Sequence, residues 1–301
     1  MKIQTLVVWY VTLQIFSLAG LPLAFAWLRT LPSRGYAAAK ALGLLLSGVL
    51  LWWGGIAHVW HNTAGAALMA ALIVLALGIW RLRGRWREIV PWWREHRAFV
   101  LATEALFLIA FVLWAAVRAT QPQIATAGGE KWMEIAFLNA LQRSPSLPPH
   151  DPWLSGFAIS YYYLGYLLLS MLTSVAGIPA TLAFTLGNAA WFALAAVVAY
   201  GIVYDLLDGR DPFGALLAPV LLLLTGNATG FLQLLHARGL LPAAFWRWLD
   251  IRGLNSAPSA DGAWPTPAHF DWWRASRTLH DKAPISTPAN PISQEVIDEF
   301  P

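Results

Sequence analysis

The chain has 301 residues, of which 58% are apolar and only 12% are charged, and it contains 18 tryptophans. A soluble domain of this length cannot bury that much apolar surface, so the composition excludes a soluble globular protein. The chain has no cysteine, which excludes disulfides, thiolate metal ligands and cysteine nucleophiles. We predict an all-α, polytopic membrane protein with about seven hydrophobic helices and additional amphipathic helices on the external side.

Residues 1–97 contain three apolar runs, at 5–28, 41–60 and 64–80. Each has a length within the ~17–25 residues that cross a bilayer, so we interpret this region as an N-terminal three-helix membrane extension. The first run has an alternative, because Ala24, Phe25 and Ala26 imitate a signal-peptidase site. However, the run exceeds the ~7–15 apolar residues of a secretory signal, which favours a first span.

Two loops concentrate the positive charge. Arg29, Arg34 and Lys40 follow the first run, and six arginines against two glutamates occupy residues 81–97. Basic loops between apolar runs are typical of the cytoplasmic side, whereas binding of nucleic acid or acidic lipid would be a rarer explanation. We therefore expect a multi-pass plasma-membrane protein with both loops inside, and we predict no nucleic-acid partner.

Residues 98–250 form the predicted core membrane domain. Its first span, residues 99–117, would carry the chain outward and place an acidic loop, residues 118–156, on the external side. Glu104 lies within this span, where an ionisable group is expensive. We favour a structural over a functional role for it, because it lies about two turns from the basic loop.

The external loop holds the candidate site. Glu130 and Glu134 are four residues apart, so on a helix they would share one face and repel each other. Lys131, a divalent cation or a cationic substrate group could offset that repulsion, and paired carboxylates are also suited to general-base catalysis. The alternative is structural, because acidic residues near a helix N-terminus complement the helix dipole.

A short amphipathic helix at 132–141 is predicted to lie on the membrane surface, because it is too short to cross. Four prolines then make residues 144–152 extended and stiff, and this segment carries His150 and Asp151. We predict that the carboxylates of Glu130, Glu134 and Asp151 lie within about 10 Å of one another, near a tyrosine.

Residues 157–177 form the next predicted helix, whose first half carries Tyr161, Tyr162 and Tyr163. Tyrosines at this position also suit an interfacial aromatic belt. The length fits a crossing, but we favour a steeply tilted or partly re-entrant helix. In that arrangement the turn at 205–211 would be cytoplasmic.

Further spans are predicted at 182–204 and at 213 to about 235. From residue 251 the chain becomes rich in proline and scattered charges, so residues 251–301 form a polar, aromatic-rich loop. We expect this loop to be external, to pack on another surface, and to be truncated by the end of the chain.

Several short motifs from Glu104 onward resemble the large uncharacterised membrane-protein family named for its Tyr-Tyr-Tyr motif. The motifs are Gly129-Glu130-Lys131-Trp132-Met133-Glu134, Pro148-Pro149-His150-Asp151-Pro152-Trp153, Tyr161-Tyr162-Tyr163-Leu164-Gly165, Trp273-Arg274-Ala275-Ser276-Arg277 and Ile297-Asp298-Glu299-Phe300-Pro301. Members of that family are similar to C-type glycosyltransferases, which use a polyprenyl-phosphate sugar. They usually have aspartate at the position of Glu134, and they continue well beyond Glu-Phe-Pro, so this chain resembles an amino-terminal portion.

The resemblance implies a glycosyltransferase acting at the external face on a polyprenyl-phosphate sugar. Glu134 or Asp151 would be the general base, with Glu130 beside them, and Glu130 and His150 would hold a divalent cation, Mg²⁺ or Mn²⁺. The lipid phosphate would be bound by basic and tyrosine side chains, namely Lys131, Tyr161, Tyr162, Tyr163, Arg274 and Arg277. The alternative is a non-enzymatic carrier or envelope scaffold, in which aromatic loops bind membrane lipid or a protein partner.

Overall fold

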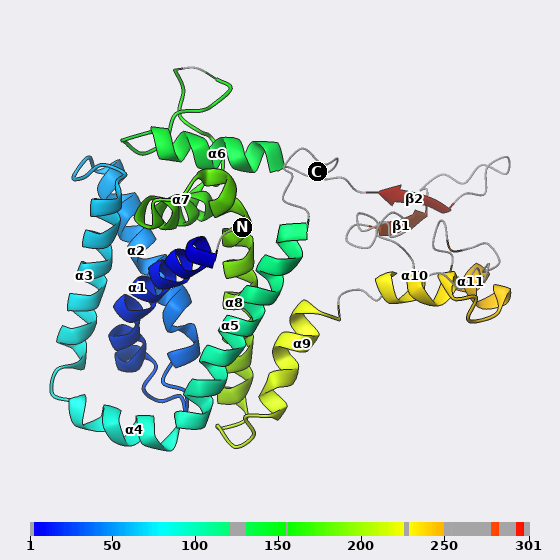
Figure 1. Ribbon diagram of the computed structural model, residues 1–301, viewed down its shortest axis with the longest axis horizontal. Helices are drawn as coiled ribbons and strands as arrows, with labels where there is room; N and C mark the ends of the chain where they lie inside the picture. The colour runs from blue at the N-terminus through cyan, green and yellow to red at the C-terminus, as the bar shows by residue number, and fades with distance from the viewer. Residues whose placement is uncertain are drawn as a thin grey trace. The chain divides into compact units, whose positions relative to one another are not determined.

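The computed structural model describes residues 3–120, 131–154, 156–225, 229–249, 254, 278–282 and 293–297 (Figure 1). The chain forms two compact units, Met1–Leu223 and Leu224–Pro301. The first unit includes helices from both the predicted N-terminal extension and the predicted core. The candidate site belongs to it.

Five helices in the described part of the chain are long and apolar enough to cross a membrane. They are α1 (Ile3–Trp27), α2 (Ala39–Ile56, preceded by the 3-10 turn η1, Tyr36–Ala38), α3 (Ala64–Leu82), α5 (Arg97–Thr120) and α8 (Ala180–Leu206). These candidate spans contain 19 to 27 residues, which at ~1.5 Å per residue matches a ~30 Å hydrocarbon core. Two shorter apolar helices are α7 (Leu164–Ala176) and the η3–α9 segment (Gly214–Leu216 and Leu217–Leu223). The all-α, multi-pass prediction is confirmed.

Glycines let α1 pack closely against both of its neighbours. A Cβ added at Gly43 of α2 would collide with the backbone carbonyl of Phe16, and one added at Gly78 of α3 would lie 2.8 Å from the nitrogen of Leu23. Small residues at such crossings allow backbones to approach, and this packing is a main source of helix association in lipid. The first three helices therefore form one tight cluster.

The two basic loops lie at the same end of the first unit. Arg34 pairs with Glu88 at 3.0 Å, and the Trp92 indole donates to the carbonyl of Pro32 at 2.9 Å. Here the second basic loop contains η2 (Trp86–Glu88) and α4 (Ile89–Glu95), and α4 runs across the ends of the long helices (Figure 1). The prediction that both loops share one side of the membrane agrees with these contacts.

The turn after α8 also lies at this basic end. The backbone N–H and the hydroxyl of Ser33 donate to the Asp205 carboxylate at 2.7 and 2.6 Å. Charge-assisted bonds of this kind are about twice as strong as neutral ones, so they fix the position of the turn firmly. The turn at 205–211 is therefore on the same side as the basic loops.

The opposite end is covered by α6 (Lys131–Arg143) and α7, which lie across the long helices (Figure 1). Asn62, in the α2–α3 connection, donates from its side chain to the carbonyl of Leu141 and from its backbone to that of Pro145. With 13 residues, α7 is shorter than the ~17–25 residues of a spanning helix. Because α5 and α8 connect the two ends, these lengths and contacts agree with the predicted tilted or partly re-entrant tyrosine helix.

Glu104 has a structural partner within the bundle. The ammonium of Lys40 lies 2.6 Å from its carboxylate, and the Tyr36 hydroxyl donates to the same oxygen at 2.9 Å. The Lys40 side chain is only 6% exposed. This pairing joins α2 to α5 and supports the structural role favoured for Glu104.

The prediction of one span from 213 to about 235 was wrong. The helix α9 ends at Leu223, residues 224 and 225 form a turn and a bend, and the next helix, α10 (Thr229–Ala237), begins in the second unit. Pro219 is tolerated because it lies in the first turn of α9. The Thr225-Gly226-Asn227 sequence is a poor helix former, which the apolar composition of the run concealed.

The second unit contains α10, α11 (Ala243–Leu249) and an antiparallel pair of strands, β1 (Thr278–Lys282) and β2 (Ser293–Ile297). Thr278 is opposite Ile297 in the ladder. Trp246 is fully buried here, and its indole donates to the carbonyl of Leu240 at 3.1 Å. Part of the polar region predicted as a loop therefore forms a small ladder.

Candidate functional site

The candidate site lies in residues 131–176, which we call the cap. Its first element is α6, which buries Ile135, Leu138 and Leu141 against the bundle. The helix is fixed to α7 by Gln142, whose amide donates to the Ser170 hydroxyl at 2.6 Å and to the Ser174 hydroxyl at 3.0 Å. The predicted amphipathic helix is confirmed, with one face buried and a polar end joined to the next helix.

The proline-rich strap, residues 144–163, folds back on itself. His150 bridges to Ala158, Asp151 N–H donates to the Phe157 carbonyl, and Ile159 N–H donates to the Pro149 carbonyl. Prolines provide no N–H, so the strap forms only this short ladder rather than an extended sheet. This pairing keeps residues 157–159 out of a helix.

Asp151 is held at the tip of the strap. Its Oδ1 accepts the backbone N–H groups of Trp153 and Leu154, each at 2.8 Å. This is an Asx-type turn, in which the side chain replaces a backbone acceptor. Both bonds go to Oδ1, so the turn orients the carboxylate and leaves Oδ2 outside it.

The tyrosine triplet lies before α7 and not within it. The helix begins at Leu164, with Tyr163 as its N-cap residue, so the prediction of a helix from 157 was wrong. The strap pairing is the physical reason, because it holds the chain extended up to Ile159. The three rings therefore project from an irregular segment before the helix and do not encircle it.

The tyrosines have different partners. Tyr161 and Tyr162 lie with ring centroids 4.0 Å apart, and the Tyr161 hydroxyl donates to that of Tyr162 at 2.6 Å. The Tyr163 hydroxyl accepts the indole N–H of Trp52 in α2 at 2.8 Å. The triplet thus connects the cap to a membrane-spanning helix.

The Phe137 ring of α6 contacts three other aromatic rings of the cap. Its ring centroid lies 5.9 Å from Trp153 of the strap, 5.5 Å from Tyr161 and 5.6 Å from Tyr166. Glu134 is one turn earlier on the same helix, and positions three apart are neighbours on a helix surface. One aromatic cluster therefore connects the helix of Glu134, the strap of Asp151 and the tyrosine motif.

An open apolar cavity of about 310 Å³ lies on α2. It is lined by Trp52, Trp53, Ile56 and Ala57 at the cap end of α2. Trp52 is also the donor to Tyr163, so the cavity wall and the tyrosine motif share a residue.

Not every predicted site residue can be placed. Glu134, Lys131, His150, Asp151 and the three tyrosines lie in the cap, whereas Glu130, Arg274 and Arg277 lie outside the described residues. Within the described ranges, no three His, Cys, Asp or Glu side chains form a group that could hold a metal ion. The predicted cluster of three carboxylates therefore remains a prediction.

Sequence reasoning missed the residues that build the cap. Trp52, Asn62, Phe137 and Gln142 each join segments distant in sequence. Asn62 and Gln142 did carry a signal, because each is a polar side chain at the edge of an apolar run. Trp52 and Phe137 carried none, since aromatic residues are abundant throughout the chain.

These features define a multi-pass α-helical membrane protein with a polar, aromatic cap at the end opposite its basic loops. Residues 46–301 match the family described as uncharacterized membrane protein (DUF2298), and the chain belongs to that family. The match includes the whole cap, about half of the second candidate span and all of α3, α5 and α8. No curated protein and no solved structure matched the chain.

Replacing Tyr163 with phenylalanine should lower the stability of the protein by about 1–2 kcal/mol, because it leaves the Trp52 indole without its acceptor. Thermal denaturation of the purified full chain in detergent measures this effect. Tyr162→Phe is the matched control, since Tyr162 is 71% exposed and its hydroxyl bonds only within the triplet in the described contacts. Equal losses in the two variants would contradict the anchoring role of Tyr163.

Proposed function

We propose that the chain is a membrane glycosyltransferase of the C-type, which transfers a sugar from a polyprenyl-phosphate donor at the external face of the plasma membrane. The assignment of the external face follows from the basic loops, because positively charged loops stay in the cytoplasm. The cap lies at the other end of the spans. It would therefore meet a lipid-linked donor and a hydrophilic acceptor together.

The observation that supports the proposal best is a series of contacts between an oriented carboxylate and an apolar cavity. Asp151 is fixed by two backbone N–H bonds, and its neighbour Trp153 contacts Phe137. Phe137 contacts Tyr161, and two residues later Tyr163 bonds to Trp52 on the cavity wall. A polyprenyl chain in the cavity would place its phosphate near the tyrosines.

In the proposed reaction, an acceptor hydroxyl attacks the anomeric carbon of the donor sugar. A new C–O bond forms there, the bond from that carbon to the phosphate oxygen breaks, and polyprenyl phosphate leaves with the electron pair. The hydroxyl proton passes to a carboxylate, for which Asp151 and Glu134 are the candidates. The fixed orientation of Asp151 favours it, because a general base must be within hydrogen-bond reach of the proton it removes.

The other predicted roles belong to the same proposal. Tyrosine hydroxyls and Lys131 would bind the donor phosphate, together with Arg274 and Arg277, which lie outside the described residues. Glu130 and His150 would hold a divalent cation. A set of one carboxylate and one imidazole suits Mn²⁺ better than Mg²⁺, which prefers oxygen ligands.

A donor-consumption assay tests the proposal. The full chain in proteoliposomes would be given polyprenyl-phosphate mannose or polyprenyl-phosphate glucose with a short alkyl glycoside as acceptor. We expect release of polyprenyl phosphate and formation of the glycosylated product, both followed by mass spectrometry. If the donors bind but are not consumed, the carrier alternative would replace the enzymatic one.

A further inference from the structure

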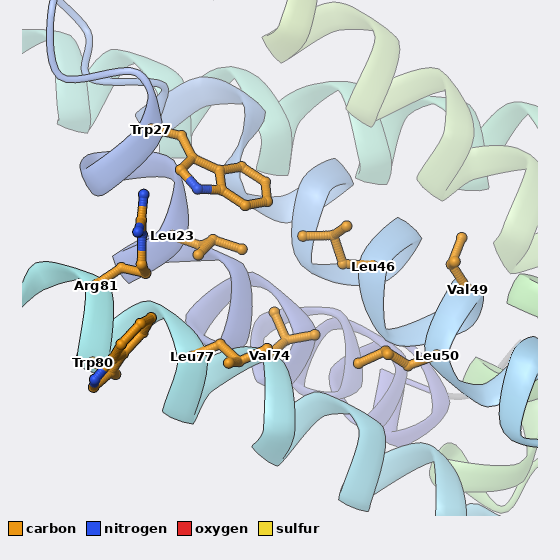
Figure 2. A pocket seen from close by; sticks show the side chains of 9 residues that line it. All are labelled: Leu23, Trp27, Leu46, Val49, Leu50, Val74, Leu77, Trp80 and Arg81. Atoms are coloured by element: carbon orange, nitrogen blue, oxygen red, sulfur yellow. The ribbon is translucent and has the colours of Figure 1, made fainter.

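A second apolar cavity, of about 430 Å³, lies in the first unit near the basic loops (Figure 2). It is lined by residues of α1, α2 and α3, namely Leu23, Trp27, Leu46, Val49, Leu50, Val74, Leu77, Trp80 and Arg81. Its volume falls within the ~300–1,000 Å³ of ordinary ligand sites. We call it the groove.

One end of the groove is charged and the other is apolar. Figure 2 shows Arg81, Trp80 and Trp27 together at one end, and Val49 and Leu50 at the other. Arg81 lies in the last turn of α3, and Trp27 is the last residue of α1, so the charged end adjoins the basic loops. Tryptophans at that level are typical of the membrane interface.

The groove is about as long as the hydrocarbon part of one leaflet is thick. Leu50 lies 11 residues beyond Ala39, the first residue of α2, which at ~1.5 Å per residue is about half of a ~30 Å hydrocarbon core. Val74 lies seven residues before Arg81 on α3, which is about 10 Å at the same rise and so also within one leaflet. A single acyl chain that enters at the basic end would therefore reach the apolar end of the groove, near Leu50.

The charge at the mouth is available to a ligand. Arg34 of the neighbouring loop pairs with Glu88, but among the described residues no carboxylate lies within ion-pair distance of Arg81 or Arg83. Both guanidinium groups instead lie over the Trp80 ring, at 5.9 and 5.3 Å from its centroid. Arginine suits a phosphate especially well, because its planar donors can bond two oxygens.

We propose that the groove is a binding site for an anionic phospholipid of the cytoplasmic leaflet. One acyl chain lies over Leu23 and Val74, which form the buried part of the lining, and the phosphate binds Arg81 between the two tryptophans. The site is separate from the cap and faces the opposite leaflet. It would couple the stability of the first three helices to the lipid composition of the membrane.

Native mass spectrometry of the full chain in detergent tests the site, with phosphatidylglycerol and phosphatidylcholine carrying the same acyl chains as probes. We expect one phosphatidylglycerol to bind at least tenfold more tightly than phosphatidylcholine. Arg81→Gln should weaken phosphatidylglycerol binding at least fivefold, whereas Arg87→Gln, a change in the same loop that does not line the groove, should leave it unchanged. Equal losses in both variants would show general attraction to positive charge and overturn the proposal.

The acyl-chain part of the proposal has its own pair of variants. Leu77→Trp places a large ring in the groove, whereas Leu72→Trp changes an exposed position of the same helix outside it. Leu77 and Leu72 are 48% and 55% exposed, so both variants should fold. Leu77→Trp should reduce binding of both lipids at least fivefold and Leu72→Trp should not. Unchanged binding in Leu77→Trp, or a dimer of the chain that excludes phosphatidylglycerol, would overturn the site.

Discussion

Replacing Asp151 with asparagine is expected to reduce sugar transfer by about a hundredfold or more while leaving the cap folded. The Asx turn uses Oδ1 as acceptor for Trp153 and Leu154, and an asparagine side chain offers the same oxygen. The variant therefore removes the negative charge and its capacity to accept a proton, but not the turn. A general base typically contributes about 10²–10⁴-fold to the rate. The donor-consumption assay measures the loss.

Two further variants make this test specific. Asp151→Ala removes the turn as well as the charge, so it should lose both activity and thermal stability. Glu134→Gln keeps the size of the α6 side chain and tests the other candidate base. Full activity in Asp151→Asn together with loss in Glu134→Gln would transfer the role to Glu134, and full activity in both would refute a carboxylate base in the described cap.

Separating the Lys40–Glu104 pair should produce the largest loss of stability in the bundle. Glu104→Gln would leave the Lys40 ammonium, whose side chain is 6% exposed, without a charged partner. Removing one member of a fully buried pair typically costs about 3–5 kcal/mol, and because the Glu104 side chain is 30% exposed we expect a loss near the lower end of that range. Unfolding of the full chain in mixed micelles measures the change in free energy.

The double variant Lys40→Met with Glu104→Leu should recover most of that loss, because it removes both charges together. Arg34→Gln is the surface control. Its partner Glu88 is 48% exposed, so loss of that pair should cost less than about 1 kcal/mol. Similar losses for Glu104→Gln and Arg34→Gln would mean that the Lys40 pair is as well hydrated as a surface one.

Much of the membrane architecture could be predicted from the sequence because its signals are local. The runs at 5–28, 41–60 and 64–80 are uniformly apolar over the length of a span, and each became a helix close to the expected bounds. The arginines in 81–97 likewise predicted which end of the bundle carries the basic loops. Lipid allows such runs few conformations other than a helix, since every backbone N–H and C=O must find its hydrogen-bond partner within the protein.

The cap was less predictable because it depends on contacts between distant segments. Pairing between Pro149 and Ile159 keeps the chain up to Ile159 out of α7, and the hydrophobic periodicity gave no sign of this pairing. The use of Asp151 in a turn depends on the conformation of the two residues after it. The spacing of the carboxylates and tyrosines predicted a common site, whereas it gave no sign of the aromatic cluster on Phe137.

Cysteine labelling at two positions tests most directly whether the cap and the basic loops face opposite sides of the membrane. The chain has no cysteine, so Ser160→Cys and Asp208→Cys each provide a single, exposed thiol, one in the cap and one in the turn after α8. In intact cells, a membrane-impermeant maleimide should label Ser160→Cys, and it should label Asp208→Cys only after permeabilisation. Labelling of Asp208→Cys in intact cells would contradict the topology and remove the basis for an external site.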